Sequence, residues 1–322
     1  MGHDHHHGHN HQHGHGHDHG HSHAHGHHHH APTDFGRAFA IGVALNLAFV
    51  IVEAAAGLWT NSLALLADAG HNLSDVLGLI LAWVAVELAK RAPTARRTYG
   101  LRKGTILASL ANAATLIFAI GAIAWEAVRR FSDPQPIEAG PVMVVAAIGV
   151  AINTGTALMF MKGSKGDLNI RGAFLHMAAD AAVSAGVIVA ALVMSVTSWV
   201  WIDPVVSLVI VLVILLGTWG LLRDSLDLAL DAAPRDIDPT AVRAWLESLP
   251  GVTEVHDLHI WALSTTETAL TAHITRPEGD DGDTFLHEAC SGLNNKFRIG
   301  HATLQVERGG AVDCRLAPAH VV

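Results

Sequence analysis

Two histidine–aspartate pairs with the same spacing lie within long apolar stretches of this sequence. His71 and Asp75 are four residues apart, and His176 and Asp180 repeat that spacing much later in the chain. Residues four apart lie on one face of an α-helix, so each pair can offer an imidazole and a carboxylate to one ion. Two imidazoles and two carboxylates can close a tetrahedron around Zn²⁺, whereas Mg²⁺ or Ca²⁺ would favour ligands that are all oxygen.

A shared metal ion is one of two explanations for such residues in an apolar setting. Ionisable side chains at membrane depth are costly without a partner, and each histidine could instead hydrogen-bond a carboxylate of its own or a neighbouring helix. The repetition of the pair favours the ion. Asp68 lies on the same helix face as His71, where we expect it either to attract the ion from the cytoplasmic side or to take part in helix packing.

The apolar stretches themselves predict an integral membrane protein. Half of the 322 residues are apolar and 15% are charged, a balance that fits a membrane protein with a soluble attachment. Six stretches approach the roughly 20 residues that cross a bilayer as a helix. We place these spans at Ala38–Leu58, Leu63–Leu88, Thr105–Val128, Val142–Met161, Gly172–Met194 and Pro204–Leu222.

The basic residues of the links predict how these spans are oriented. Six lysines and arginines lie at 90–103, after the second span, and three lie at 162–171, after the fourth. Basic links face the cytoplasm, so both termini are expected there, and the leading segment has no signal-peptide pattern. Cys290 and Cys314 then lie in the cytoplasm without a CxxC spacing, which predicts free thiols.

Residues Met1–His30 alternate histidine mainly with glycine and other small or acidic residues. Such a segment cannot bury a core, so residues 1–34 are predicted to form a disordered cytoplasmic tail. Its imidazoles suit zinc, copper and nickel and would hold such ions loosely near the membrane. A purification tag is the alternative, but the interspersed pattern favours a native chelating segment.

A small soluble domain is predicted after the six-helix membrane domain of residues 35–230. Asp238-Pro239 is a typical helix start, and the later runs alternate as strands do. The predicted order is αββαβ, a ferredoxin-like α+β domain with two helices on one face of a three-stranded sheet. Within residues 231–310, ahead of a flexible tail at 311–322, its elements are a helix to about Ser248, strands at Val252–Leu263 and Glu267–Thr275, a helix from Asp283 to about Phe297, and a strand at Ala302–Arg308.

The same residues resemble a known family. Ser62–Asp75, which reads SLALLADAGHNLSD, and His176–Asp180, which reads HMAAD, are similar to motifs of the cation diffusion facilitator family, and above all to its bacterial cobalt–zinc–cadmium resistance and animal zinc transporter branches. The resemblance implies a six-helix domain, a metallochaperone-like cytoplasmic domain, a homodimer, and metal–proton exchange by alternating access. It covers residues 37–308 and includes Thr98–Gly100, Val255–Trp261 and His301–Glu307.

The resemblance also implies roles for particular residues. It places the transport site on the two histidine–aspartate pairs, a ligand set associated with zinc preference. It pairs Lys103, at the start of the third span, with Asp231, past the sixth, as a charge pair that helps to hold the dimer. A further metal site that some members carry before the third span is expected to be absent, because Arg96–Arg102 offers no ligand. The implied cytoplasmic ligands are His256, His273 and Glu307, with His287 as a candidate ligand of a second ion.

Strand alternation agrees with only part of this cytoplasmic set. His273 and Glu307 fall on polar faces, whereas His256 has the parity of the core-like Leu258. A β-bulge at the start of the strand would bring His256 to the polar face. His259 is the competing ligand, and any one of these histidines could equally be a surface or hydrogen-bonded residue.

The function expected from the sequence is proton-coupled export of Zn²⁺, with cobalt, cadmium and nickel as further candidates, across a bacterial inner membrane. A membrane-bound metal sensor without flux is the alternative, but it would not need paired ligands on two spans. An enzyme is not expected, because His287-Glu288 has Ser291 where an HExxH metal helix needs its second histidine. The expected partners are divalent metal ions, protons, lipid and a second copy of the chain, and not nucleic acid.

Overall fold

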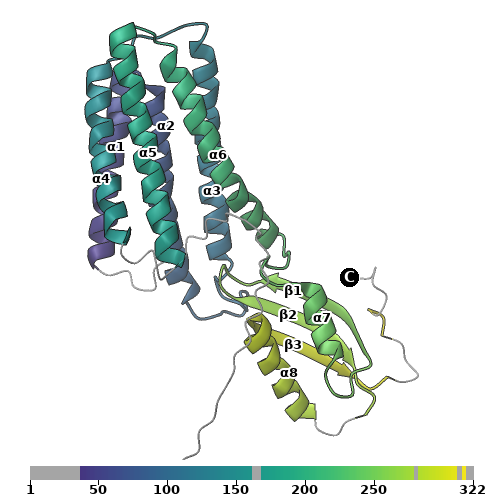
Figure 1. Cartoon of the computed structure of the whole chain (residues 1–322). Helices are drawn as coiled ribbons and strands as arrows, with labels where there is room; N and C mark the ends of the chain where they lie inside the picture. Colours follow the sequence, from purple (N-terminus) through teal and green to yellow (C-terminus); the bar gives the residue numbers. More distant parts are fainter. Residues whose placement is uncertain (1–36, 162–167, 279–281, 310–313, 317–322) are drawn as a thin grey trace, which may run out of the picture.

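The computed structural model describes residues 37–161, 168–278, 282–309 and 314–316 of the chain. A bundle of long helices is followed by a small α+β domain, which we call the C-terminal domain (Figure 1). This is the predicted fold class. The predicted chelating tail, Met1–His30, lies outside the described residues.

Six helices of the described chain are long and apolar enough to cross a membrane. Each predicted span lies inside one of them, so the span assignment is confirmed. The helices are α1 (Arg37–Thr60), α2 (Leu63–Ala89), α3 (Gly104–Arg130), α4 (Ala139–Met161), α5 (Leu168–Thr197) and α6 (Ile202–Ala229).

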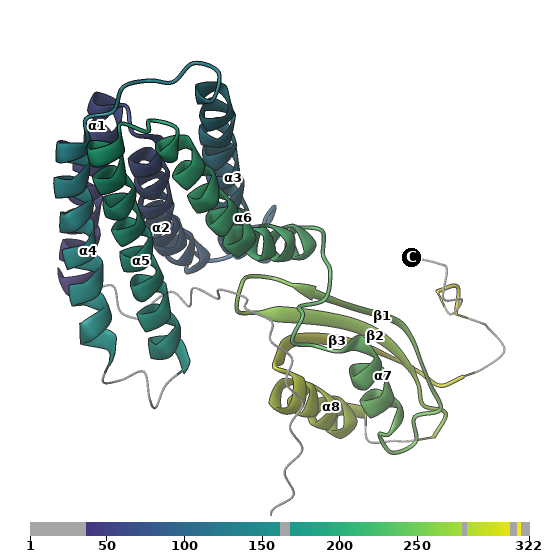
Figure 2. The same ribbon diagram turned by 45° about the horizontal axis from the view of Figure 1, so that its top comes forward.

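The helices form two groups (Figures 1 and 2). α1, α2, α4 and α5 stand together, and α3 and α6 form a pair beside them that leads to the C-terminal domain. The buried apolar core draws on the first turns of α2 and α4, the first half of α6, the middle of α3 and the last turns of α5. The bundle is therefore packed most closely in the half that lies away from the C-terminal domain, which we call the far half.

A buried carboxylate of α6 fixes the start of α2. Asp203 is fully buried. Its carboxylate accepts hydrogen bonds from the Ser62 hydroxyl at 2.7 Å and from the backbone amides of Leu63 and Ala64 at 2.8 and 3.2 Å. Amides at a helix N-terminus have no partner within the helix, and a negative charge there is favourable. Because α2 carries the first histidine–aspartate pair, this contact ties the position of that pair to α6.

The C-terminal domain has the predicted αββαβ order. α7 (Pro239–Glu247) begins after Asp238, whose carboxylate accepts a hydrogen bond from the Thr240 amide at 2.9 Å. In the sheet, of order β1-β2-β3, the first two strands are antiparallel and the last two parallel. α7 and α8 cover the face that carries Leu270 and Ile274, which leaves the opposite face to polar side chains (Figure 2). The other elements are β1 (Glu254–Ala262), β2 (Thr268–Thr275), α8 (Gly282–Phe297) and β3 (Ile299–Glu307).

A β-bulge lies near the start of β1. His256 and His259 are three positions apart, but their partners in β2, His273 and Thr271, are only two positions apart. Asp257, inside this interval, has a left-handed φ of 49°. The extra residue reverses the alternation, so His256 faces away from the helices while later residues of β1 still pack against them. This irregularity is the one that His256 needs to share a face with the other candidate ligands.

Candidate metal centres

The two histidine–aspartate pairs meet between α2 and α5. Each histidine approaches the carboxylate of the opposite helix. The Nε2 atom of His71 lies 3.2 Å from Oδ1 of Asp180, and the Nε2 atom of His176 lies 3.0 Å from Oδ2 of Asp75. The two imidazole rings are 5.6 Å apart and nearly perpendicular, at 82°. We call these four residues the helix cluster.

The ligand atoms of the helix cluster are spaced as a tetrahedral ion requires. One ligand atom from each residue lies within 4.8 Å of all the others. The distances from histidine nitrogen to carboxylate oxygen run from 3.0 to 3.8 Å. Bonds of about 2.0–2.2 Å to zinc would place neighbouring ligand atoms of a tetrahedron about 3.3–3.6 Å apart. The residues present therefore fit a zinc-sized ion with only small adjustments.

The helix cluster is closed toward the far half of the bundle. Most of residues 63–69, at the start of α2, are buried, and the buried residues of α5 lie from Asp180 onward. Toward the C-terminal domain, α2 and α5 are mostly half-exposed. Asp75, on that side of the cluster, keeps 26% of its side chain exposed. The open side of the helix cluster therefore faces the C-terminal domain.

Two further carboxyls lie directly beyond the helix cluster. Asp68 is fully buried, one turn before His71, and accepts a hydrogen bond from the Ser184 hydroxyl at 2.7 Å. Glu53 of α1 is also fully buried and accepts one from the Asn72 amide at 3.0 Å. Asp68 lies on the closed side, and its expected role of attracting the ion from the cytoplasmic side stays a prediction. Its contact with α5 fits the packing alternative.

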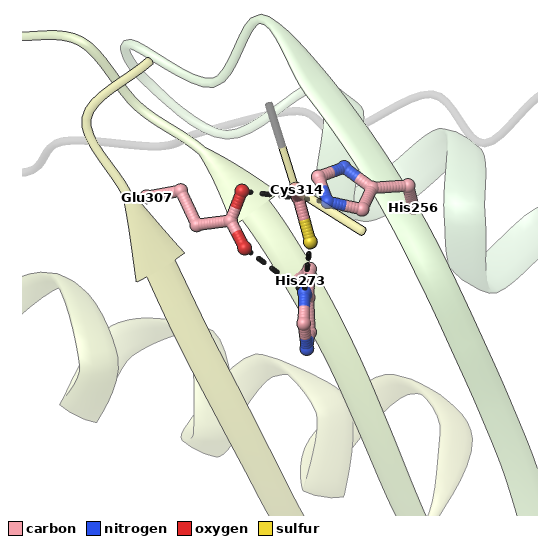
Figure 3. Close-up of side chains that lie close together, drawn as sticks. All are labelled: His256, His273, Glu307 and Cys314. Carbon is pink, nitrogen blue, oxygen red and sulfur yellow. Dashed lines mark hydrogen bonds and ion pairs between the residues drawn. The ribbon is translucent and has the colours of Figure 1, made fainter. Parts of the chain in front are cut away.

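A second group of ligands lies on the free face of the sheet. His256 and His273 are cross-strand partners in β1 and β2. Glu307 is two residues beyond Gln305, the β3 partner of His273, and alternation puts it on the same face. Cys314, from the segment after β3, lies over these side chains (Figure 3). We call His256, His273, Glu307 and Cys314 the sheet cluster.

The sheet cluster is as compact as the helix cluster. Four ligand atoms, one from each residue, lie within 4.8 Å of one another. The Nδ1 atom of His273 is 2.9 Å from Oε1 of Glu307 and 3.3 Å from Sγ of Cys314. The Nε2 atom of His256 is 3.4 Å from the other Glu307 oxygen. Figure 3 shows the four side chains converging from three strands and the following segment.

The electrostatics of the sheet cluster suit a cation. Burial disfavours the charged form of Glu307, but hydrogen bonds from Cys314 and Gln305, together with the nearby imidazoles, hold the pKa of this carboxyl below its usual value. His256 is 6% exposed, and neither of its ring nitrogens has a hydrogen-bond partner. An unsatisfied buried polar group costs roughly 1–3 kcal/mol, which a bond to a metal would offset.

Several expected residues lie outside both clusters. His287 is exposed on α8, which covers the other face of the sheet, so a second ion there stays a prediction. His259, the competing candidate, is 44% exposed and lies 2.9 Å from the Asp257 carboxylate. Lys103 and Asp231 do meet, with Nζ 2.5 Å from Oδ1, and this ion pair forms within one chain where the two domains join.

The link before α3 contributes to neither cluster. Within the described part of the chain, the helix and sheet clusters are the groups of three or more histidine, cysteine, aspartate or glutamate residues close enough to hold one ion. Arg96, Arg97 and Arg102 instead line a cavity of about 760 Å³ that lies against residues of β1.

One residue of the sheet cluster, and one that positions the helix carrying half of the helix cluster, were not predicted. Cys314 was expected to be a free thiol in a flexible tail; it is free of disulfide bonds, but its sulfur belongs to the sheet cluster. Its residue type, a soft ligand following a histidine-bearing sheet, was the one available signal. Asp203 belongs to no recognised motif. Its contact with α2 joins residues about 140 positions apart, so neither spacing nor periodicity could indicate it.

Comparison with known proteins agrees with the division of the chain. Residues 39–228 match the family described as "Cation efflux transmembrane domain". Residues 234–309 match the family described as "Cation efflux protein, cytoplasmic domain". The first match ends within α6 and the second begins just before α7, so the two matches coincide with the two parts of the structure.

Individual relatives are similar over most of their length. The "Metal cation efflux system protein CzcD" of Cupriavidus metallidurans is 37% identical over 272 residues, which are 84% of this chain and 86% of the relative. The "Zinc transporter ZitB" of Escherichia coli is 36% identical over 281 residues, 86% and 90% of the two chains. The "Cadmium, cobalt and zinc/H(+)-K(+) antiporter" of Bacillus subtilis is 34% identical over 264 residues, 80% and 85% of the two chains.

Proposed function

The chain belongs to the cation diffusion facilitator family of cation efflux proteins, and from this premise we propose that it exports Zn²⁺ from the cytoplasm in exchange for protons. Members of this family are metal transporters and not enzymes, and this chain is an integral membrane protein. Cobalt, cadmium and nickel are the further substrates that we propose, because imidazole nitrogen also binds these ions.

The observation that supports export most directly is the even division of the helix cluster between two helices. α2 and α5 each supply one histidine and one aspartate. A shift of α5 against α2 would therefore change every cross-helix ligand distance at once, without unfolding either helix. We assign the present arrangement, open toward the C-terminal domain, to the state that receives the ion from the cytoplasm. A second state would open the far half, and zinc and protons would bias the two states differently.

Protons compete with zinc for the same ligands. Zinc binds neutral imidazole and ionised carboxylate, so a site that takes up protons loses its ion. In the proposed cycle, protons from the outer side reach His71 or His176 and release the ion there. The relative from Bacillus subtilis is named as an antiporter that exchanges metal for H⁺ and K⁺, which is consistent with exchange.

In the proposal, the sheet cluster holds a regulatory zinc ion. His256, His273 and Glu307 come from three different strands, so a bound ion would stiffen the sheet. In a homodimer, such an ion would bias the C-terminal domains toward a packing that is competent for transport. The Lys103–Asp231 pair, at the junction of the two domains, is proposed to help hold that dimer.

The membrane and the orientation are part of the same proposal. Basic residues gather in the link at 90–103, beside the C-terminal domain. This distribution supports a cytoplasmic location of both termini, and the bacterial relatives favour the inner membrane.

Metal-resolved flux in proteoliposomes tests the proposal. Vesicles with an acidic interior should take up zinc faster than vesicles without a pH gradient, and cobalt and cadmium should be compared in the same preparation. Zinc uptake at the same rate with and without the pH gradient would contradict exchange for protons but would still support zinc transport. If the inserted, folded protein binds zinc but moves none of these ions, it is instead a membrane-bound metal sensor.

A further inference from the structure

The chain returns to the sheet after β3 has ended. β3 ends at Glu307, and Gly309 has a left-handed φ of 62°, a conformation that glycine adopts without strain. Cys314 then lies over the ligand-bearing face, with Sγ 3.3 Å from Nδ1 of His273 (Figure 3). A residue outside the αββαβ elements is thus placed against side chains of the sheet.

Cys314 occupies the position that a three-residue site would leave open. His256, His273 and Glu307 supply two nitrogens and one oxygen. Zinc sites with three protein ligands keep a fourth position for water or substrate, whereas structural sites are closed by four protein ligands. The sulfur of Cys314 lies within 4.8 Å of the other three ligand atoms and completes that count.

The state of His256 is a second and independent pointer to a cation. This side chain is buried to more than nine-tenths, yet neither ring nitrogen has a hydrogen-bond partner. Its Nε2 atom is turned toward Glu307, 3.4 Å away (Figure 3). Buried polar atoms are nearly always satisfied, and a metal bonded to Nε2 would satisfy this one.

Neighbouring polar groups hold the ligands in place. Oδ2 of Asp257 lies 3.6 Å from Nε2 of His273, whose other nitrogen faces the thiol. The Gln305 amide donates a hydrogen bond to Oε1 of Glu307 at 2.9 Å. Outer carboxylates and amides of this kind orient metal ligands, so the arrangement resembles a built site more than a chance meeting of side chains.

We propose that Cys314 is the fourth ligand of a closed zinc site formed within one chain by the sheet cluster. Zinc binding replaces the S–H bond of Cys314 by an S–Zn bond and releases the proton to water, because the thiolate is the ligand form. The soft sulfur shifts the preference of the site toward zinc and cadmium. The ion also fastens the segment around Cys314 to all three strands. This inference rests on the regulatory zinc proposed above but not on transport through the helix cluster.

Cobalt(II) binding distinguishes a thiolate ligand from every other ligand in the chain. A thiolate–cobalt bond gives a strong charge-transfer absorption in the near ultraviolet, which nitrogen and oxygen ligands do not give. The sequence contains two cysteines, Cys290 and Cys314, so Cys290→Ser is the matched control. When the full-length protein in detergent is titrated with Co²⁺, the wild type and Cys290→Ser should develop this band and Cys314→Ser should lack it.

Further variants keep the test independent of folding and of transport. Asp75→Ala, in the helix cluster, should lose zinc flux yet keep the charge-transfer band, which separates the two proposals. Metal-free Cys314→Ser should melt at the temperature of the metal-free wild type. A band that persists in Cys314→Ser, or a wild type without one at saturating Co²⁺, would overturn the assignment.

Alkylation gives a second readout with zinc itself. One equivalent of zinc beyond the capacity of the helix cluster should slow iodoacetamide labelling of Cys314 at least about tenfold, because the metal-bound thiolate is a poor nucleophile. Cys290, whose thiol has a pKa raised by burial, should label slowly at the same rate with and without zinc. Equal labelling of Cys314 with and without zinc would contradict the proposal.

Discussion

The helix cluster and the sheet cluster offer the same number of ligand atoms but draw them from the fold in different ways. In the helix cluster, two helices supply two ligands each, four residues apart. In the sheet cluster, three strands and the segment after them supply one ligand each. An ion can leave the first by a relative movement of two rigid elements. To leave the sheet cluster, an ion must break its bonds to ligands on four separate segments of the chain. The helix cluster therefore suits an ion in transit, and the sheet cluster suits an ion that stays bound.

The donor atoms of the two clusters also favour release of the ion from the helix cluster and its retention in the sheet cluster. The helix cluster offers two nitrogens and two carboxylate oxygens, and the sheet cluster replaces one carboxylate by the Cys314 sulfur. A carboxylate yields its ion readily to water or a proton, whereas thiolate binds zinc and cadmium more strongly. From this comparison we expect changes in the helix cluster to control flux, and changes in the sheet cluster to control retention and regulation.

The largest effect is expected from removing one charge of the helix cluster. Asp180 lies 3.2 and 3.6 Å from the two histidine nitrogens. Asp180→Asn keeps the shape but leaves one less charge to compensate a desolvated divalent ion, so zinc flux in proteoliposomes should fall at least about 100-fold. Glu87→Gln, an exposed carboxylate of α2 paired with Lys90, is the control and should transport normally. Wild-type flux and pH dependence in Asp180→Asn would rule out the helix cluster as the transport site.

A change of ligand type should have a smaller and more selective effect. His176→Asp keeps a ligand but exchanges a borderline nitrogen for a hard oxygen, and it removes an imidazole that can take up a proton in place of the ion. Selectivity between zinc and cadmium should broaden by about tenfold or less, and the dependence of flux on the pH gradient should weaken. Zinc and cadmium flux measured across one pH series would reveal both effects. An unchanged selectivity and an unchanged pH slope would mean that His176 takes no part in coupling.

Ligand removal in the sheet cluster should reduce flux without abolishing it. His273→Ala or Glu307→Ala should weaken one class of zinc sites in calorimetry of the full-length protein by at least about tenfold, because three ligands hold zinc less well than four. Flux should fall by only a few-fold. His259→Ala removes an exposed neighbouring histidine and should change neither quantity. Unchanged binding in both ligand variants would show that the sheet cluster is not a zinc site.

The smallest effect is expected from the leading histidines. Deleting Met1–His30 should leave maximal zinc flux intact and raise the zinc concentration for half-maximal flux by about two- to fivefold, because weak sites only concentrate ions near the membrane. A dose series of zinc flux with the truncated protein measures both values. Complete loss of flux would mean that this segment takes part in the transport site itself.

The helix cluster could be predicted because most of its geometry is local. The spacing of His71 and Asp75 fixes their common face once the stretch is known to be a helix, and the cost of burying both pairs in a membrane points to a shared ion. The sequence does not show toward which end of the bundle the helix cluster is closed. The burial of Asp68 depends on Ser184, more than a hundred residues away.

The sheet cluster was harder to predict because it depends on exceptions to regular structure. Strand alternation placed His273 and Glu307 correctly on a polar face, but His256 joins them only through the bulge. No sequence pattern predicts the positive φ of Asp257. Cys314 lies past the last strand, where neither alternation nor helical spacing constrains the path of the chain, so its contact with His273 became apparent only in three dimensions.

The bulge in β1 limits which insertions and deletions this strand can tolerate. A strand of regular alternation cannot present His256 to the free face and also keep Ile260 in the core. Straightening the bulge at the present strand length would therefore turn the imidazole toward α7 and α8, or else expose the apolar residues of the strand. Deleting one residue between these two would instead remove the bulge and leave both side chains on their present faces. A chimaera that exchanges β1 with that of a relative would need to transfer the bulge and His256 as one unit, even where both strands have the same length.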